Sequence, residues 1–229
     1  MKKICDDLIK EFDKQQLELK KEIKIKDIDL SKIKTIAGID IAYWEKDSIE
    51  YGGCSIVILD YKTKKIIEKV EYVGKIFYPY ISGYLSFREI PLILETLKKV
   101  KTNIDLYMLD GNGYLHPKHM GIATHISHYL KKPCIGVAKT YLKVNNIKYF
   151  EPLNIVGAYT EIRNNDDILG IALRTKKDCK PIFVSIGNYI SLHNCYDIVM
   201  NLINSESRIP LPTRYADIET HLIRKKYKE

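Results

Sequence analysis

The spacing of apolar residues divides the chain into a helical start and a following run of strands. Ile4, Leu8 and Phe12 recur every four residues among charged side chains, which predicts an amphipathic helix. Residues 20–34 are rich in lysine and isoleucine and are expected to lead into a sheet. Apolar runs then predict three strands, with a hairpin turn before the third, over residues 35–43, 52–60 and 65–76.

The remaining pattern alternates between helical periodicity and short apolar runs. It predicts helices over residues 85–100, 118–130, 192–203 and 213–227. It predicts strands, the third and fourth of which form a hairpin, over residues 104–109, 133–138, 155–159, 168–174 and 181–185. Three antiparallel strands followed by alternating helices and strands favour an α/β fold, with a mixed β-sheet flanked by helices on both faces.

Length and composition fit one domain. The 229 residues contain no internal repeat, which predicts a single domain over residues 1–229, with residues 1–34 as its N-terminal helix and lead-in segment. No apolar run approaches the roughly 20 residues that span a bilayer, and the N-terminus lacks the apolar stretch of a signal peptide. We therefore expect a cytoplasmic protein without a membrane partner. No expected helix has a spare apolar face, which favours a monomer.

Cysteine usage and charge narrow the classes of function. The five cysteines are widely scattered and never spaced as CxxC, which argues against a disulfide framework and a zinc ribbon. The formal net charge of +8 fits a nucleic-acid partner, although lysine-rich proteins that never bind nucleic acid are also common. The motifs GxSxG, Walker A and GxGxxG are absent, which disfavours a serine hydrolase, a P-loop ATPase and a Rossmann dehydrogenase.

Three carboxylates stand where burial is expected. Asp40 and Asp110 each follow an apolar run, and Glu89 lies near the start of a predicted helix. A buried carboxylate is costly unless it is paired or bound to a metal, and Mg²⁺ or Mn²⁺ prefers such oxygen ligands. Taken singly, each residue also fits an ordinary role, as a turn former, a helix cap or a surface charge.

Other candidate groups are ambiguous on their own. Tyr80 follows a proline in a loop and could stack on a base, but it could equally pack on a sheet edge. Histidines 116, 119, 125 and 128 lie close together in the chain without a cysteine or carboxylate at zinc-site spacing. A solvated or capping role therefore suits these histidines better than a zinc site.

Six segments, in a fixed order, change this picture. They are residues 37–43 (AGIDIAY), 78–89 (YPYISGYLSFRE), 110–118 (DGNGYLHPK), 121–125 (GIATH), 135–139 (IGVAK) and 208–217 (RIPLPTRYAD). Together they resemble the endonuclease V family, the deoxyinosine 3′ endonucleases. The resemblance covers nearly the whole chain and is specific as a set, although no single segment is.

The resemblance implies a ribonuclease H-like fold and a divalent-metal site. Asp40 and Asp110 would bind the metal from neighbouring strands, and Glu89 matches the family's third carboxylate. Lys139 would steady the phosphate or the attacking water. The implied catalytic residues are thus Asp40, Glu89, Asp110 and Lys139, and the implied cofactor is Mg²⁺, with Mn²⁺ as a substitute.

The resemblance also implies the substrate contacts. Tyr80, between Pro79 and Ile81, matches the tyrosine that wedges into the duplex at the lesion. The pocket for a flipped hypoxanthine would be lined by backbone groups near Gly83, Leu85, Gly111 and Gly136, with His116 beside it. The implied reaction hydrolyses the second phosphodiester bond 3′ to the deaminated base in DNA and so initiates repair.

Two positions depart from the family pattern. Ser82 replaces the second proline of the family's PYIP loop, which loosens the loop but keeps Tyr80. Asn188 stands where the family normally has a histidine, close to the metal site, and asparagine does not titrate near neutrality. His193, five residues further on, is a candidate to replace that histidine in part.

Two other functions stay open at this level. If Asn188 impairs proton transfer, the loss of roughly 10²–10⁴-fold in rate would leave a protein that binds inosine-containing nucleic acid but cuts it poorly. The second alternative is an inosine-specific ribonuclease acting on RNA, because the 2′-hydroxyl is read by local geometry that a sequence does not reveal.

Overall fold

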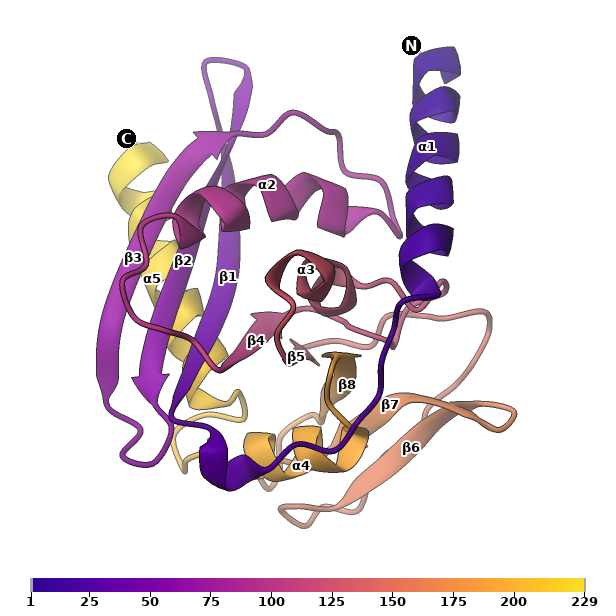
Figure 1. The fold of residues 1–229 in the computed structure, drawn as a ribbon, viewed down its shortest axis with the longest axis vertical. Helices are drawn as coiled ribbons and strands as arrows, with labels where there is room; N and C mark the ends of the chain where they lie inside the picture. The colour runs from indigo at the N-terminus through magenta and orange to yellow at the C-terminus, as the bar shows by residue number, and fades with distance from the viewer. Residues whose placement is uncertain (1, 229) are drawn as a thin grey trace.

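A mixed eight-stranded sheet organises the computed structural model, which describes the backbone of residues 2–228 and the side chains of residues 6–228 (Figure 1). The strand order across the sheet is β3-β2-β1-β4-β5-β8-β7-β6. The strands are β1 (Thr35–Lys46), β2 (Ile49–Asp60), β3 (Ile66–Lys75), β4 (Leu106–Asp110), β5 (Cys134–Ala138), β6 (Tyr159–Asn164), β7 (Asp167–Leu173) and β8 (Ile182–Asn188).

Strand directions divide the sheet into three parts. β1, β2 and β3 form an antiparallel meander, and β4 and β5 run parallel to β1. β8, β7 and β6 continue the sheet with antiparallel pairing. The parallel strands are short and buried on both faces, because helices cover them on either side. The expected mixed α/β architecture is confirmed.

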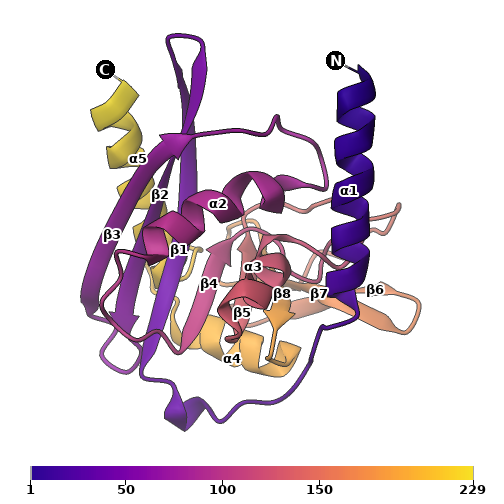
Figure 2. The same ribbon diagram turned by 45° about the horizontal axis from the view of Figure 1, so that its top comes forward.

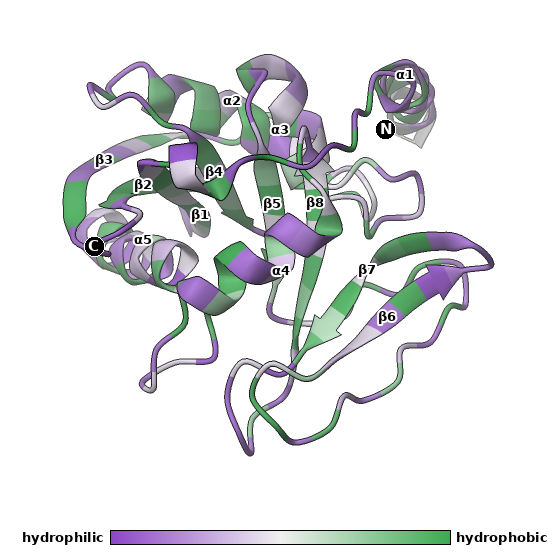
Figure 3. Ribbon diagram, turned by 60° about the horizontal axis from the view of Figure 1, so that its bottom comes forward, coloured by the Kyte–Doolittle hydropathy of each residue, from purple (hydrophilic) through white to green (hydrophobic). Residues whose placement is uncertain are grey.

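Helices cover both faces of the sheet. α2 (Leu85–Leu97) and α3 (Ile122–Leu130) lie on one face, and α4 (Leu192–Asn201) and α5 (Leu211–Lys228) on the other (Figure 3). α1 (Lys2–Lys20) stands beside the α2 and α3 layer, as Figure 2 shows, and leads through the short 3₁₀ helix η1 (Leu30–Lys32) into β1. Among the helices described, none combines the length and apolar character that crossing a membrane requires.

Side chains on β1 and β4 alternate between the two faces. Ile39 and Leu109 belong to the core that packs against α2 and α3, whereas Ile36 and Met108 belong to the core that packs against α4 and α5. Side chains an even number of positions apart on a strand point to the same face. The residue four positions after Ile36 and the residue two positions after Met108 therefore point toward the face covered by α5. Those residues are Asp40 and Asp110.

Two predicted elements are wrong in their bounds. Residues 155–159 were expected to form a strand, but Ile155 is 63% exposed and the strand β6 begins only at Tyr159. β6 is the edge of the sheet and buries only Ile162, so its sequence lacks an apolar alternation. The helix expected from residue 118 begins at Ile122, because residues 111–121 form the loop that follows β4.

The clustered histidines are not solvated as expected. His116, His125 and His128 are buried, and Nδ1 of His125 lies 2.8 Å from the hydroxyl oxygen of Ser86 on α2. His125 and His128 lie on the buried side of α3, whereas His116 lies in the loop before that helix. Burial lowers the pKa of His125 to about 3. They therefore act as neutral polar groups of the interior.

Candidate metal centre and nucleic-acid site

Parallel pairing brings Asp40 and Asp110 together. The register of β1 with β4 places Ile39 opposite Leu109, so the two aspartates are adjacent one step further along. Burial raises the pKa of Asp40 to about 6, and the neighbouring charge of Asp110 adds to the effect. Burial also raises the pKa of Asp110, against the opposing influence of Lys139. The predicted convergence of these two carboxylates, far apart in the chain, is present in the structure.

A third carboxylate comes from α5. Among the described residues, one oxygen each from Asp40, Asp110 and Asp217 lie within 4.8 Å of one another. The hydroxyl of Thr220, one turn along α5, donates to Oδ2 of Asp40 over 2.6 Å. Asp217 was not singled out from the sequence, although it ends the segment 208–217. Its only local signal was that membership, because an aspartate on an amphipathic helix is ordinarily a surface charge.

Gly38 explains how α5 comes so close to β1. A Cβ atom at residue 38 would lie 1.9 Å from the carbonyl oxygen of Pro212, at the start of α5. Only a residue without a side chain lets the helix backbone contact the strand there. This contact sets the height of α5 over the sheet, and Asp217 faces the two strand aspartates as a result.

Lys139 completes the group. Its ammonium lies 2.6 Å from Oδ2 of Asp110 and 2.6 Å from Oδ1 of Asp217. Burial acts to lower the pKa of Lys139, but the carboxylates of Asp110 and Asp217 outweigh it and raise the pKa. Lys139 directly follows β5, whose pairing with β4 places Val137 opposite Asp110.

The charges of this cluster fit a divalent cation. Three half-buried carboxylates face one lysine, so ionisation of all three leaves an excess of negative charge in a poorly solvated place. Oxygen ligands of this kind are those that hard divalent cations prefer. The acidic cluster therefore indicates a metal site, held by Asp40, Asp110 and Asp217.

Glu89 approaches the cluster from the other face of the sheet. It lies on α2, is almost fully buried, and accepts a 2.5 Å hydrogen bond from the hydroxyl of Tyr43. Burial raises the pKa of Glu89 to about 8, with the hydrogen bond from Tyr43 opposing this shift and the charges of Asp40 and Asp110 contributing to it. Glu89 thus interacts electrostatically with Asp40 and Asp110 but is not one of the three clustered carboxylates.

The loop between β3 and α2 projects from the molecule. We call residues 76–84 the wedge loop. Tyr80 at its tip is 70% exposed, Pro79 is exposed and Ile81 is half-buried, so the expected wedge residue is free to contact a partner. Arg88 on α2 donates to the carbonyl oxygen of Tyr78 over 2.8 Å and ties the loop to the helix.

A small cavity lies at the base of the wedge loop. Its volume is about 150 Å³, and it is lined by residues 82–84, 116–118, 142 and 143. Of the predicted contacts, Gly83 and His116 line this cavity, as does the departing residue Ser82. Leu85, Gly111 and Gly136 do not line it. Gly136 instead allows the loop after β4 to pack closely on β5, because a Cβ atom at residue 136 would lie 2.4 Å from the backbone nitrogen of Gly113.

Helix α1 supports this cavity from outside. Gln16 is fully buried and donates from Nε2 to the carbonyl oxygen of Gly83 over 3.2 Å. Asp13 accepts a 2.5 Å hydrogen bond from the hydroxyl of Tyr84 and pairs with Lys118. Phe12 stacks on Phe87 with ring centroids 3.8 Å apart. The first helix therefore holds two of the segments that line the cavity.

Asn188 does not lie near the metal cluster, contrary to expectation. β8 runs antiparallel to β5, so Asn188 pairs with Cys134, whereas Phe183 pairs with Ala138 beside Lys139. Asn188 is buried at the far end of the strand, where its Oδ1 accepts hydrogen bonds from the backbone nitrogens of Lys24 and Tyr189. It fastens the lead-in segment, so its replacement of a histidine gives no reason to expect impaired catalysis.

His193 also lies away from the cluster. It is exposed on α4, and its Nε2 is 3.3 Å from Oδ2 of Asp197 on the same helix. The helix follows β8 at the end that carries Asn188. His193 therefore cannot contact the carboxylates in this arrangement.

Comparison with known proteins gives the family. The endonuclease V family model matches residues 17–218. Endonuclease V of Bacillus thuringiensis subsp. konkukian is 53% identical over 97% of this chain and 95% of its own length. The crystal structure of Bacillus subtilis endonuclease V has a TM-score of 0.93 and 50% identity, covering 96% of this chain and 93% of its own.

A more distant structure includes a ligand. Ciona intestinalis endonuclease V, in complex with a 24mer DNA containing an inosine followed by a ribo-adenosine, has a TM-score of 0.84 at 27% identity. The match covers 96% of this chain and 99% of that one. The ribonuclease H-like α/β fold implied by the sequence segments is confirmed by these likenesses. The carboxylate cluster, the exposed wedge loop and these matches together show that the chain belongs to the endonuclease V family, whose members are DNA-cleaving nucleases.

Proposed function

We propose that this protein is a Mg²⁺-dependent endonuclease that recognises inosine in DNA and hydrolyses the second phosphodiester bond 3′ to it, an incision that initiates repair. The convergence of Asp40, Asp110 and Asp217 with Lys139 carries the proposal. Their oxygen ligands suit Mg²⁺, with Mn²⁺ as a substitute. The inosine-containing DNA bound by the relative from Ciona intestinalis supports the choice of substrate.

The residues divide the work at the phosphate. Asp40, Asp110 and Asp217 would hold the cation, which would supply charge neutralisation at the phosphate and a lower pKa for a water bound to it. Lys139 stays protonated, because the two carboxylates beside it raise its pKa, so it acts as a cation that steadies the phosphate or the water. Glu89, on the opposite face, is assigned to a second metal ion or to its waters.

The cavity below the wedge loop is assigned to the flipped hypoxanthine. Gly83 presents its backbone there, and His116 lines the same wall. Burial lowers the pKa of His116 to about 4, so its ring is neutral at pH 7. Its Nδ1 accepts from the backbone nitrogen of Lys118, so Nε2 carries the proton of the neutral ring, and a hydrogen bond to the backbone of Gly83 holds the ring against the same wall. Leu85, Gly111 and Gly136 would shape the backbone around this pocket.

Tyr80 is assigned to the space that the flipped base leaves in the duplex. An exposed ring at the tip of a loop can enter a base stack, and its stacking contacts offset part of the free energy of unstacking the flipped base. Pro79 and Ile81 would flank the Tyr80 ring in the wedge loop. Ser82 in place of a second proline frees one backbone position without removing the ring.

A cleavage assay tests the function. The intact protein with Mg²⁺ should cut a deoxyinosine oligonucleotide at the second phosphodiester 3′ to the inosine and leave the matching adenine oligonucleotide intact. Asp110→Ala should lose at least ~10²-fold in rate, since it removes a ligand of the cation. Equal cleavage by both proteins would reject the assignment of Asp110, and cleavage of neither oligonucleotide would reject the proposed function.

The preference between DNA and RNA needs its own assay. The Ciona intestinalis complex contains a ribo-adenosine directly after the inosine, which shows that this relative accepts a ribonucleotide there. Matched DNA and RNA strands with one inosine, cut side by side at equal concentrations, separate the deoxyribonuclease from the inosine-specific ribonuclease. Faster cleavage of the RNA strand would replace the DNA assignment.

We also assign the protein a monomeric state in the cytoplasm. Cys54, Cys134 and Cys195 are free and buried, which suits a reducing compartment. Light scattering at assay concentration should give the mass of one chain, and a stable dimer would contradict this assignment.

A further inference from the structure

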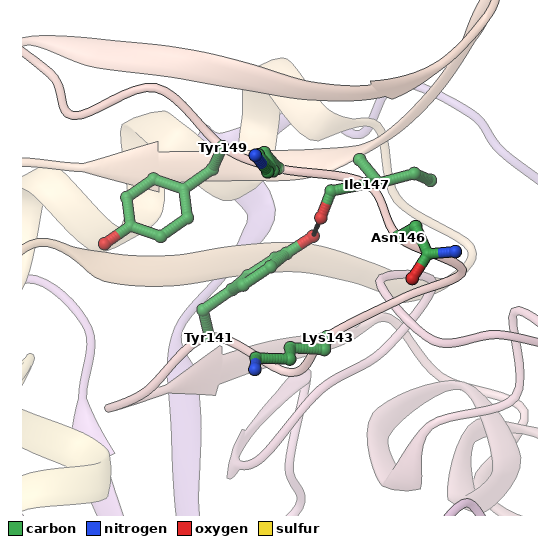
Figure 4. A pocket seen from close by; sticks show the side chains of 6 residues that line it. Tyr141, Lys143, Asn146, Ile147 and Tyr149 are labelled. Carbon is green, nitrogen blue, oxygen red and sulfur yellow. Dashed lines mark hydrogen bonds between the residues drawn. The ribbon is translucent and has the colours of Figure 1, made fainter.

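A second and larger cavity lies next to the one assigned to the base. It is formed by the loop between β5 and β6 and has a volume of about 590 Å³. Loops as long as this one, with no regular structure, are uncommon in compact folds unless they have a function. Six residues line the cavity, namely Tyr141, Lys143, Asn146, Ile147, Lys148 and Tyr149 (Figure 4).

Contacts within the loop and with the sheet support the walls of this cavity. The hydroxyl of Tyr141 donates to the carbonyl oxygen of Ile147 over 2.7 Å, as Figure 4 shows. The backbone nitrogen of Ile147 donates to the carbonyl oxygen of Val144, whose side chain is buried. The rings of Tyr141 and Tyr149 pack on each other and on Phe183 of β8, with centroids 4.9–5.4 Å apart. The cavity is therefore built on the sheet.

The lining has the chemistry of a nucleotide site. Lys143 and Lys148 are exposed cations, and the lining contains no carboxylate. Tyr141 and Tyr149 bring aromatic rings to the same cavity, and Asn146 adds an amide that can both donate and accept. Sites that follow a single strand combine a cationic surface with rings on which bases stack.

The two cavities share a wall. Lys143 lines both of them, and its neighbour Leu142 lines only the smaller one. The same segment begins at Lys139, which contacts Asp110 and Asp217. A strand with its inosine in the smaller cavity and its phosphate at the carboxylates would thus have a neighbouring nucleotide within reach of the larger cavity.

We propose that this larger cavity is a second subsite, which holds a nucleotide flanking the inosine on the same strand, with its base against Tyr149 and its phosphate at Lys148. The inference rests on the proposed function, because it takes the inosine to occupy the smaller cavity. This contact would not distinguish one base from another. It would increase the affinity for inosine-containing nucleic acid and position its strand beside the carboxylate cluster.

Binding measurements on the full chain with Ca²⁺ in place of Mg²⁺ test the subsite. Lys148→Ala should weaken binding of a long inosine oligonucleotide several-fold and reduce the slope of log affinity against log salt by about 1. Tyr149→Ala should weaken it about tenfold, and Tyr149→Phe should restore it because the ring is kept. Shortening the oligonucleotide on the side whose nucleotide occupies the larger cavity removes the proposed contact. An oligonucleotide shortened in this way should bind all these variants equally.

Controls keep the outcomes distinct. Lys32 is also exposed but lies on η1, ahead of the first residue of β1, and lines neither cavity, so Lys32→Ala should bind like the unmodified protein. If the unmodified protein cuts and binds inosine DNA but Lys148→Ala and Tyr149→Ala match it in affinity and salt slope, the subsite is rejected alone. If the unmodified protein neither binds nor cuts, the proposed function fails, and the subsite with it.

Discussion

The hydroxyl of Thr220 donates a 2.6 Å hydrogen bond to Oδ2 of Asp40, joining α5 to the first strand of the sheet. The two residues are 180 positions apart in the chain. Thr220 is fully buried, and its hydroxyl also contacts the carbonyl oxygen of Asp217 one turn earlier. This contact fixes the orientation of the Asp40 carboxylate, which lies in the cluster with Asp110 and Asp217.

Removing that hydroxyl should loosen the metal ligand. Thr220→Val keeps the shape of the side chain but not the donor, so we expect cation affinity to fall about 10–100-fold, as for other outer-sphere partners. Calorimetric titration with Mn²⁺ measures this directly. Thr220→Ser keeps the hydroxyl and serves as the matched control; a loss of the same size in both variants would contradict the role of the hydrogen bond.

Asp217 should be as important as the strand aspartates. Asp217→Asn removes one of the three clustered carboxylates, so Mn²⁺ affinity should fall on the order of tenfold or more. The same titration on Glu89→Gln shows whether the carboxylate on the opposite face shares the ion. Unchanged Mn²⁺ affinity in Asp217→Asn, together with loss in Glu89→Gln, would assign the third ligand to Glu89 instead.

A methyl group at residue 38 should separate α5 from β1. Since a Cβ atom there would lie 1.9 Å from the backbone of Pro212, we expect Gly38→Ala to lower the free energy of unfolding by about 3 kcal/mol or more. Urea denaturation followed by circular dichroism measures this. Mn²⁺ affinity should fall in the same variant, because Asp217 moves with the helix. A variant as stable as the parent would show that the backbone contact is not needed.

Gln16 should support recognition of inosine without touching the metal. Gln16→Ala removes the donor to Gly83, so we expect affinity for inosine DNA to fall several-fold while Mn²⁺ affinity is unchanged. Fluorescence anisotropy with inosine and adenine oligonucleotides measures the effect. Lys14→Ala, an exposed position on the same helix, is the control. Equal weakening toward both oligonucleotides would mean that Gln16 does not act on the base.

His125 should make the fold sensitive to acid. Burial lowers its pKa from 6.5 to about 3, so below pH 6.5 the unfolded chain takes up a proton that the folded chain does not. The free energy of unfolding then falls by up to about 1.4 kcal/mol per pH unit between pH 6.5 and 3. His125→Gln should flatten this dependence in urea titrations at pH 7 and pH 5. An unchanged dependence would exclude His125 as its source.

The sequence by itself determined most of the strands and two of the carboxylates that end their apolar runs. Apolar runs that end in aspartate predicted β1 and β4 and marked Asp40 and Asp110, because burial and strand periodicity are local properties. The ordered segments likewise indicated Lys139, the exposed Tyr80 and the family. Edge strand β6, which buries only Ile162, carried too little apolar signal to be placed correctly.

Only the tertiary structure decided which distant groups meet. Asp217 joins the cluster because α5 rests on Gly38, and nothing in the helix's own pattern indicates that contact. Asn188 lies at the end of β8 far from Lys139, because β8 runs antiparallel to β5. The direction of a strand has no local signature in the sequence. The same holds for the two cavities that share Lys143, because the smaller one is lined by three segments distant in the chain and the larger one by a loop without hydrophobic periodicity.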